Sequence, residues 1–488
     1  MMMPFDRDCF RCRRQAGGAL RLLLGGLTLA CLVAGLVLMI RWKRPHWLDR
    51  ESVDAVALQK LQTTELAVSP AAAAKEWPQW FGPGRDGRAP EGPFRTDWKA
   101  VPPEILWTTP CGGGYSSLVL VENRLYTLDR LGDQERIVCL QADSGQPLWV
   151  HEYPVDYAAA GISYDAGPRA TPLWYKHRLY CLGATGIFHC LLVQGDSPPE
   201  VIWKHDLKSA FAAEIPTWGL ACSPLAEGGL ILLQAGGKLG TLAAFDADTG
   251  ELRWTAGNDP IGYSSPVAVT AAGVRQIVAV SGTSVLGVDP TGGRILWSHP
   301  WRTDHYGNIA TPLVIGNYVF LSSNYGKGCM LLELHSGDPE TRPGQVDARV
   351  VYFRKGRVMM NHHSTSVYHD GHLYGYDNNT LRCVNLREGE VVEHWIARDD
   401  REQALEKGCL ILAGKHLVGL TQRGTVFLAE ADPHEFRFRG QREKVLDGSK
   451  SDCWALPILV AGRLYLRDHQ KVVCLDLRDA SAQREASE

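Results

Sequence analysis

The stretch "AAFDADTGELRW", residues 243–254, joins an apolar run, a turn rich in Asp and Gly, and a terminal Trp. The segments "CLQADSGQPLW" (139–149) and "GVDPTGGRILW" (287–297) keep the same spacing between the turn glycine and the Trp. Looser versions are "LLELHSGD" (331–338), "RCVNLREGEVVEHW" (382–395) and "VCLDLRD" (473–479). A phrase that returns along the chain predicts a repeat architecture, in which each repeat packs on its neighbours.

Each residue of the phrase has a structural role that the sequence predicts. Asp246 and Thr249 are expected to hydrogen-bond the backbone of the turn, and Gly250 is expected to adopt a positive φ. Trp254 would then cap one repeat against the next. The equivalent residues of the two close copies are Trp149 and Trp297. We therefore interpret the phrase as a packing device in which no residue is catalytic.

A second pattern lies upstream of each phrase, where a strand opens with Ser/Thr-Pro and a second strand follows a short polar turn. Examples are "ATPLWYKHRLYCL" (170–182) and "CSPLAEGGLILLQ" (222–234). A period of about 40 to 50 residues with four short strands is typical of a β-propeller. The strand openers are Ser117, Thr171, Ser223, Ser265, Thr311, Ser364, Leu410 and Leu456. We therefore predict an all-β, eight-bladed β-propeller of four-stranded antiparallel blades.

The eighth repeat ends near Leu477 without an outer strand. The segment "EILWTTP" (104–110) precedes the first repeat and carries Trp107 in the sequence context of the other outer strands. Pairing this segment into the last blade would close the ring and remove the exposed strand edges of an open stack.

Charge and cysteine usage narrow the class of protein. The formal net charge is −3, and no cluster of Lys and Arg follows residue 50, so nucleic-acid binding is not expected. Four cysteines share the register of Ala244 on successive repeats, where they would diverge beyond the distance that a disulfide spans. These cysteines, expected to be buried free thiols, are Cys139, Cys190, Cys383 and Cys474.

The N-terminal region predicts a membrane anchor. A short Arg-rich cytoplasmic tail (1–21) precedes an uncharged apolar stretch (22–40), which is close to the length that crosses a bilayer as a helix. A tether (41–75), the propeller (76–480) and a C-terminal tail (481–488) would follow. This order predicts a single-pass protein of the bacterial inner membrane whose propeller faces the periplasm. A lipoprotein modified at Cys31 and an ordinary cleaved signal are the alternatives.

The repeat Ala244–Gly250 with Trp254 resembles the tryptophan-docking repeat of the PQQ-like (quinoprotein alcohol dehydrogenase-like) β-propellers. That superfamily includes dehydrogenases that use pyrroloquinoline quinone (PQQ) and the non-catalytic outer-membrane assembly lipoprotein BamB. The segment "EWPQWFGPGRDG" (76–87) is similar to the lead-in of many exported PQQ-like proteins. We expect it to seal one face of the ring, with a ligand site as the alternative.

Loops that enter the innermost strands of a propeller lie at the mouth of its central channel, where ligands usually bind. In this chain those loops carry aromatic and hydrogen-bonding residues that would converge on one funnel. The candidates are Tyr115, Asp165, Arg169, Trp218, Tyr263, His305, Asn308, His362, His363 and Trp454. Such a funnel suits a planar or peptide ligand, and the alternative is that these residues plug the channel. No metal site is expected, because adjacent residues such as His362 and His363 would point to opposite faces of a strand.

Three functions fit this fold. The first is a membrane-anchored, non-catalytic scaffold that binds protein partners in the cell envelope and needs no cofactor. The alternative implied by the resemblance is a PQQ-dependent dehydrogenase with calcium and PQQ in the funnel. The chain departs from that pattern, since it lacks an adjacent Cys pair and a CxxCH haem motif, and only Asp165, Asp304 and Asn308 are available for calcium. The third is a sensor ectodomain, which the short cytoplasmic tail disfavours.

Overall fold

The structure is a computed structural model that describes residues 75–479, except 91, 164–166, 237–238, 339, 341–343, 357 and 450. Every described residue belongs to one compact unit of the chain. The predicted cytoplasmic tail, the membrane anchor, nearly all of the tether and the C-terminal tail lie outside the described residues. Within the described ranges, no helix is both long enough and apolar enough to cross a membrane.

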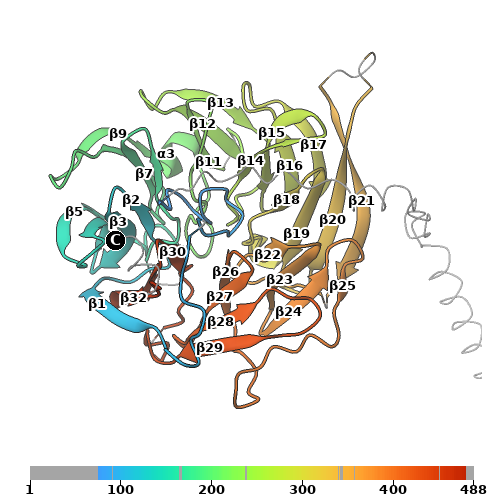
Figure 1. Cartoon of the computed structure of the whole chain (residues 1–488). Coiled ribbons are helices and arrows are strands. Elements are labelled where there is room, and N and C mark those ends of the chain that lie inside the picture. The colour runs from blue at the N-terminus through green and yellow to red at the C-terminus, as the bar shows by residue number, and fades with distance from the viewer. Residues whose placement is uncertain are drawn as a thin grey trace, which may run out of the picture. The chain divides into compact units, whose positions relative to one another are not determined.

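Eight four-stranded antiparallel sheets surround a central channel, which confirms the predicted eight-bladed propeller (Figure 1). Counted from the innermost to the outermost strand, the first blade is β2 (Val119–Val121), β3 (Arg124–Leu131), β4 (Gln134–Gln141) and β5 (Pro147–Pro154), and the second is β6 (Leu173–Tyr175), β7 (Arg178–Leu182), β8 (Ile187–Leu192) and β9 (Glu200–Asp206). The third blade is β10 (Leu225–Glu227), β11 (Leu230–Gln234), β12 (Leu242–Asp246) and β13 (Leu252–Ala256), and the fourth is β14 (Val267–Ala271), β15 (Val274–Val280), β16 (Ser284–Val288) and β17 (Ile295–Pro300). The fifth blade is β18 (Leu313–Ile315), β19 (Tyr318–Ser323), β20 (Gly328–Ser336) and β21 (Val346–Lys355), and the sixth is β22 (Val367–His369), β23 (His372–Asp377), β24 (Thr380–Asn385) and β25 (Glu390–Val391). The seventh blade is β26 (Gly408–Ala413), β27 (His416–Thr421), β28 (Val426–Glu430) and β29 (Phe438–Arg442), and the eighth is β30 (Ile458–Val460), β31 (Arg463–Arg467), β32 (Lys471–Asp476) and β1 (Glu104–Pro110). A short helix, α3 (Leu207–Phe211), links the second blade to the third, and a single 3₁₀ turn, η2 (Asp304–Tyr306), links the fourth to the fifth.

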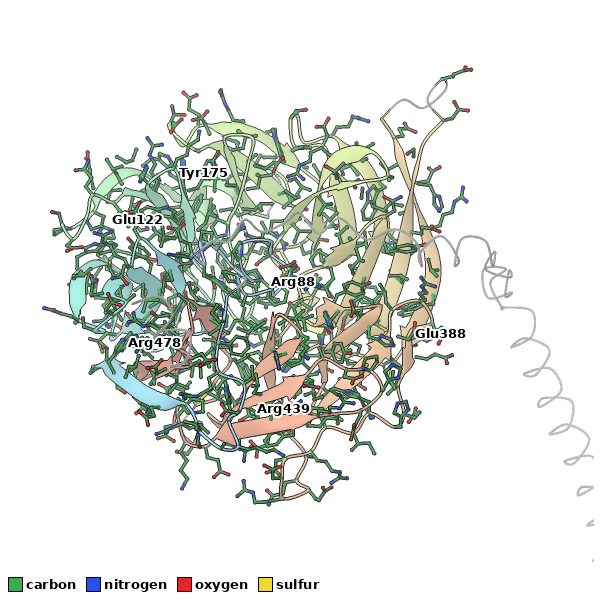
Figure 2. All side chains as sticks on the ribbon, viewed as in Figure 1. Arg88, Glu122, Tyr175, Glu388, Arg439 and Arg478 are labelled. Atoms are coloured by element: carbon green, nitrogen blue, oxygen red, sulfur yellow. The ribbon has the colours of Figure 1, made fainter. Side chains whose placement is uncertain are left out.

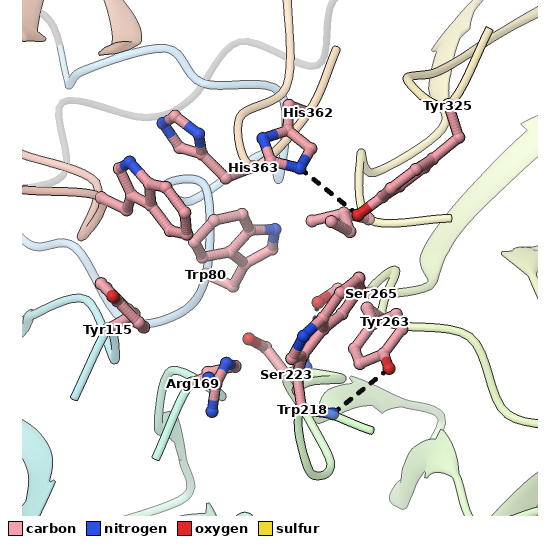
Figure 3. A pocket seen from close by; sticks show the side chains of 13 residues that line it. Trp80, Tyr115, Arg169, Trp218, Ser223, Tyr263, Ser265, Tyr325, His362 and His363 are labelled. Carbon is pink, nitrogen blue, oxygen red and sulfur yellow. Dashed lines mark hydrogen bonds between the residues drawn. The ribbon is translucent and has the colours of Figure 1, made fainter. Parts of the chain in front are cut away.

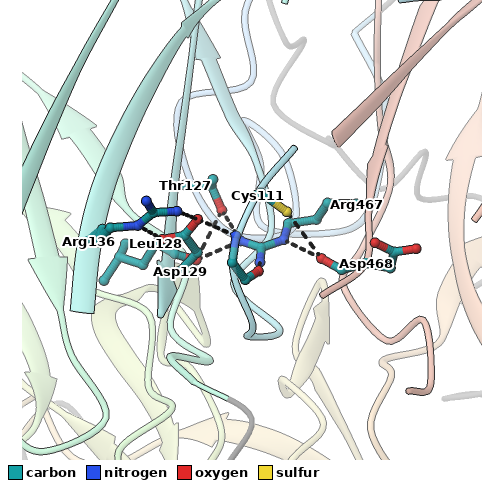
Figure 4. A network of polar contacts seen from close by, with 8 residues as sticks. Cys111, Thr127, Leu128, Asp129, Arg136, Arg467 and Asp468 are labelled. Carbon is teal, nitrogen blue, oxygen red and sulfur yellow. Dashed lines mark hydrogen bonds and ion pairs between the residues drawn. The ribbon is translucent and has the colours of Figure 1, made fainter. Parts of the chain in front are cut away.

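The ring closes as the sequence predicts, because β1 supplies the outer strand of the last blade. It pairs with β32 from Glu104 opposite Asp476 to Pro110 opposite Lys471. A buried cation strengthens the joint between the last blade and the first (Figure 4). Arg467, 1% exposed, donates to the Leu128 carbonyl at 2.6 Å and to the Gly112 carbonyl at 3.0 Å. Residues from both ends of the described chain therefore hold the ring shut.

The outer strands are bulged rather than regular. In seven of the eight blades, the register between the third and outer strands shifts by one residue close to the position of the docking aromatic. In the third blade, for example, the shift falls between Ala244, which pairs with Trp254, and Phe245, which pairs with Leu252. A bulge increases twist and interrupts the edge, so these outer strands are poor templates for pairing with another chain.

The repeated phrase forms the turn between the third and outer strands. The Asp246 carboxylate accepts the backbone N–H groups of Asp248 and Thr249, both at 3.0 Å, and Gly250 has φ +75°. Trp254 is buried, and its indole N–H donates to the Pro290 carbonyl of the next blade at 3.0 Å. Three further Trp residues reach the next blade's turn in the same way: Trp107 to Ala142, Trp203 to Ala247 and Trp395 to Asp432.

Two copies of the Trp differ from this pattern. Trp297 donates instead to the Gln276 side chain of its own blade at 2.6 Å, because the next blade carries the long β20–β21 hairpin in place of the short turn. Trp149 is buried, but its indole nitrogen makes no hydrogen bond to any described residue. Neither Trp is hydrogen-bonded to the turn of the next blade, so burial of the ring is the contribution that these two copies share with the others.

The cysteines of the described ranges are all free thiols, and nine of the ten are buried. Cys139, Cys190, Cys383 and Cys474 are among them, which confirms the prediction for that register. Burial raises the pKa of each of these four thiols to about 12, so they remain protonated and behave as small apolar residues.

The strand openers link one blade to the next around the channel. The Thr171 N–H donates to the Ser223 hydroxyl, and the Ser223 N–H donates to the Ser265 hydroxyl, both at 2.9 Å. Two predicted openers need correction by one residue. Thr365 takes the place assigned to Ser364, since its hydroxyl accepts the Thr311 N–H at 3.0 Å. Cys409 takes the place assigned to Leu410, since its thiol donates at 3.7 Å to the Ala455 carbonyl of the segment that enters the next blade.

Candidate functional site

Residues 77–89 cross one end of the channel and seal it, as expected for the lead-in segment. Its backbone contacts the far ends of several innermost strands, and Figure 2 shows Arg88 near the middle of the ring, with Glu122, Tyr175, Glu388, Arg439 and Arg478 around it. The seal touches blades on opposite sides of the channel. Its contacts are Trp77 with Leu120, Pro78 with Trp174, Arg88 with Tyr368, and Gly87 and Ala89 with Leu412.

Arg85 anchors this segment from within the protein. It is 4% exposed and donates to the Pro224 carbonyl at 2.9 Å, the Ser223 carbonyl at 3.2 Å and the Gln79 side chain at 3.1 Å. Burial lowers the pKa of Arg85 to about 10, which still leaves the guanidinium charged at neutral pH. Carbonyl oxygens, rather than a carboxylate, therefore balance this buried charge.

A cavity of about 230 Å³ lies at the other end of the channel, on the side where the innermost strands begin (Figure 3). Seven of the nine funnel candidates other than Asp165 are among the residues that line it, together with side chains that were not predicted from the sequence. The lining residues are Trp80, Tyr115, Arg169, Trp218, Ala221, Ser223, Tyr263, Ser265, Ile309, Tyr325, His362, His363 and Trp454. Asp165 lies outside the described residues.

Two candidates do not line the cavity. Asn308 is 1% exposed, and its amide group donates to the carbonyls of Ser281 and Trp301, both at 2.8 Å. This corrects the expectation that Asn308 faces the funnel, since the side chain is used to hold its own loop. His305 lies in η2 near the cavity mouth, with ring centroids 6.2 Å from Trp218 and 6.3 Å from Tyr325.

The adjacent histidines also differ from the prediction. His362 and His363 precede β22 and lie in a bend rather than on a strand, so both can line the cavity instead of facing opposite ways. His363 stacks on Trp454 with centroids 4.6 Å apart and an interplanar angle of 12°. Within the described ranges, no group of three His, Cys, Asp or Glu residues is arranged to hold a metal ion.

Four further side chains line the cavity that were not predicted from the sequence to do so: Tyr325, Trp80, Ser223 and Ser265. Tyr325 lies in the turn between β19 and β20, and such turns reach the same end of the channel as the loops that enter the innermost strands. Trp80 comes from the sealing segment and donates to the Thr311 hydroxyl at 2.8 Å. The signal for Trp80 was present in "EWPQWFGPGRDG", but a segment before the first repeat gave no indication of how deeply it enters the ring.

A chain of hydrogen bonds runs from a buried lysine to the cavity. The Lys407 ammonium donates to Nδ1 of His362, so Nε2 carries the imidazole proton and donates to the Tyr325 hydroxyl at 3.3 Å. Burial and the nearby Lys407 lower the pKa of His362 to about 4, and burial lowers the pKa of Lys407. The imidazole is therefore neutral at physiological pH. Arg169 lies over the Tyr115 ring, 5.4 Å from its centroid, and adds a second positive charge at the cavity wall.

The comparisons with known proteins agree with this architecture. A family model described as outer membrane protein assembly factor BamB matches residues 133–396, more than half of the chain. The chain belongs to the BamB family. BamB from Moraxella catarrhalis is similar in structure, with 13% sequence identity, a TM-score of 0.52, and coverage of 77% of this chain and 99% of that protein. No curated protein matches this sequence.

Members of the BamB family share their fold with enzymes. The quinohemoprotein alcohol dehydrogenase from Comamonas testosteroni has 11% identity, a TM-score of 0.56, and coverage of 87% of this chain and 84% of that enzyme. A second such dehydrogenase, from Pseudomonas putida, has 13% identity, a TM-score of 0.53, and coverage of 84% and 81%. Because a fold at this identity does not carry an activity, the chemistry of this BamB-family chain has to be judged from its own cavity.

The described lining of the cavity does not fit a calcium ion with PQQ. A calcium site needs six or more oxygen ligands, with carboxylates prominent among them. No Asp or Glu is among the described lining residues, and Asp304 lies exposed in η2. The Asn308 carbonyl oxygen already accepts the hydroxyls of Thr303 and Ser323, both at 3.0 Å. The donor set expected for the dehydrogenase alternative is therefore not brought together by the described residues.

Proposed function

We propose that this chain is a non-catalytic binding scaffold of the cell envelope that engages protein partners through the open end of its propeller. The observation that carries the proposal is the composition of the central cavity, which is aromatic and cationic and has no carboxylate in its described lining. Membership of a family described as an outer membrane protein assembly factor supports the same conclusion. No cofactor is needed for this role.

The sealed end of the channel also supports a binding role. Residues 77–89 close one face, so a partner can reach the cavity only through the mouth formed by the strand-entry loops. The exposed Tyr306 lies in η2 beside that mouth. A partner that covers the mouth would contact loops from several blades at once, which suits a scaffold.

The proposal includes the location predicted from the sequence. Residues 22–40 would anchor the chain in the inner membrane, and the propeller would face the periplasm. In spheroplasts with intact inner membranes, added protease should then degrade the propeller. Protection of the propeller until the inner membrane is permeabilised would overturn this part of the proposal.

A titration separates the scaffold from the dehydrogenase alternative. We expect no saturable heat when PQQ is added to the full-length chain, with or without calcium ions. Saturable, calcium-dependent binding of PQQ would overturn the scaffold proposal, and a loss of that binding when calcium is chelated would identify the alternative.

A second experiment tests partner binding directly. A photo-reactive amino acid at Tyr306, beside the mouth, should give discrete envelope-protein adducts in cells. The matched control is Leu252, 47% exposed on an outer strand. The same adducts from both positions, or none from Tyr306, would contradict the proposal.

A further inference from the structure

The polar wall of the central cavity presents hydrogen-bond donors, and the contacts behind the wall explain why. The hydroxyls of Ser223 and Ser265 each accept a backbone N–H from the preceding blade at 2.9 Å. The Tyr263 hydroxyl accepts the Trp218 N–H at 3.4 Å. Since each oxygen already accepts, each of these hydroxyls keeps its own proton for donation.

The Tyr325 hydroxyl is also left as a hydrogen-bond donor, because of the series of hydrogen bonds that begins at Lys407. The imidazole of His362 donates to the Tyr325 oxygen, so the phenolic proton of Tyr325 is left to point elsewhere. Burial raises the pKa of Tyr325 and raises that of Tyr263 to about 12, so both phenols remain protonated donors. The Arg169 guanidinium, which donates to the Gly167 carbonyl at 3.1 Å, adds positive charge to this wall of hydroxyl donors.

A group that only accepts hydrogen bonds and carries negative charge complements such a wall, and a carboxylate has this chemistry. The rest of the cavity favours a flat apolar group. Trp80, Trp218 and Trp454 form much of its surface, and Tyr263 lies 5.0 Å from Trp218 between ring centroids. The ligand chemistry is therefore a carboxylate next to an aromatic ring.

The shape of the channel limits which kind of molecule can bring a carboxylate and an adjacent aromatic ring into the cavity. The cavity, at about 230 Å³, has room for roughly one large side chain, and the sealing segment with Trp80 closes the far end. A long ligand can then enter only by its end. In a polypeptide, an aromatic ring next to a main-chain carboxylate occurs only at the carboxy-terminal residue. We propose that the cavity receives the aromatic carboxy-terminal residue of a partner protein, an inference that rests on the scaffold function proposed above.

Binding of three related probes to the full-length chain tests this inference by calorimetry. The first is the peptide acetyl-Gly-Ser-Gly-Phe with a free carboxylate, the second is the same peptide as its carboxamide, and the third is 3-phenylpropanoate. We expect the acid to bind saturably and the amide to bind about tenfold more weakly or worse, because charge-assisted hydrogen bonds are lost. We expect 3-phenylpropanoate to bind more weakly than the peptide acid, since it lacks the preceding residues that would contact the mouth.

Substitutions of cavity-lining residues test whether the peptide binds in the central cavity. Arg169→Gln and Tyr325→Phe should each reduce the preference for acid over amide at least threefold while leaving the melting temperature nearly unchanged. Trp218→Ala should weaken the acid peptide further, because a wall of the cavity is removed. Arg253→Gln is the matched control, since Arg253 lies half-exposed on outer strand β13 and should leave binding unaltered.

Three results would overturn the inference: no binding of the acid peptide, equal binding of acid and amide, or binding of 3-phenylpropanoate as tight as that of the peptide. The last result would identify a site for small aromatic acids. These outcomes are separate from the PQQ titration, because calcium-dependent PQQ binding contradicts the scaffold function whatever the peptides do. Failure of the peptides alone leaves the scaffold function standing with another mode of contact.

Discussion

The indole ring of Trp254 lies directly on Gly293 of the next blade, where a Cβ atom would come within 2.7 Å of ring carbon Cε3. One blade earlier, Trp203 lies on Gly250 at the same distance from the Cβ position. The copy around Trp254 therefore supplies both halves of a blade-to-blade contact. Its Gly250 receives Trp203 of the preceding blade, and its Trp254 reaches Gly293 of the following blade.

This contact predicts a sharp difference between two adjacent glycines. Gly293→Ala should lower the free energy of unfolding by roughly 2–4 kcal/mol, because the new methyl group clashes with Trp254 and Gly293 has φ +73°. Gly292→Ala should change it by less than about 0.5 kcal/mol, since no atom of the described residues lies within 4 Å of its Cβ position. Urea denaturation of both variants measures the difference, and equal effects would contradict the packing interpretation.

Truncation of the Trp itself tests the other half of the contact. Trp254→Ala should cost about 3–5 kcal/mol of stability, as expected for a large buried ring. Trp254→Phe keeps an aromatic ring but loses the hydrogen bond to Pro290, so it should cost less. Thermal unfolding of the two variants checks this order, and an Ala variant as stable as the Phe variant would show that the ring contributes little.

Much of this fold could be predicted from the sequence, because a pattern that recurs along the chain indicates that each copy forms the same structural unit. The phrase around Trp254 marks the turn of each blade, and the missing outer strand after Leu477 requires a segment such as 104–110 to complete the ring. The one-residue errors at Ser364 and Leu410 arose where Pro is absent from the opener. There the register is set by which hydroxyl or thiol bonds the neighbouring blade, and Thr365 and Cys409 have that role.

The site was predicted less completely, and the reasons are physical. Residues such as Tyr115 and Trp218 lie on strand-entry loops, whose position follows from the repeat itself. Asn308 lies on a comparable loop, but its amide satisfies buried backbone carbonyls, and no sequence pattern separates that use from ligand binding. Tyr325 belongs to a turn of variable sequence, so the repeat does not mark it.

The joint between the last and first blades predicts a large effect at Arg467. Arg467→Met should destabilise the protein by about 3–5 kcal/mol, because the buried carbonyls of Gly112 and Leu128 lose their donor. The matched variant Arg478→Met removes a partly exposed ion pair with Asp476 and should cost less than about 1 kcal/mol. Denaturation midpoints of the two variants check this, and similar losses would mean that Arg467 does not hold the joint.

Buried histidine makes the ring sensitive to acid. His189, 1% exposed, packs against Tyr153 and His151 of the first blade with centroids 4.6 Å and 5.2 Å away. Burial, with help from His151 and Lys204, lowers its pKa to about 3. An unfolded His has a pKa of about 6.5, so the unfolded chain binds the proton first as the pH falls. The contribution of His189 is thus present above about pH 6.5 and is lost progressively toward pH 3.

His189→Phe should therefore reduce the acid sensitivity of the protein. In the wild type, this residue adds up to about 1.4 kcal/mol per pH unit to the loss of stability on acidification below pH 6.5. The Phe variant should show a shallower slope between pH 6.5 and 4.5 in urea denaturation. His177→Phe is the control, since His177 is largely exposed and should leave the slope unchanged. A wild-type slope in the His189 variant would contradict this assignment.

The sealing segment, residues 77–89, contributes to both ends of the channel, so loosening it should also weaken ligand binding in the cavity. Arg85 holds this segment through the carbonyls of Ser223 and Pro224, and Ser223 also lines the cavity that Trp80 closes. Arg85→Met should raise hydrogen exchange in residues 77–89 at least tenfold and weaken the acid peptide, while the blades keep their protection. Arg88→Met removes a half-exposed contact with Asp86 and the Tyr368 carbonyl and should change both readouts much less. If exchange rises in the seal but peptide affinity is unaltered, then Trp80 does not form the floor of the ligand site and the seal is only a structural closure.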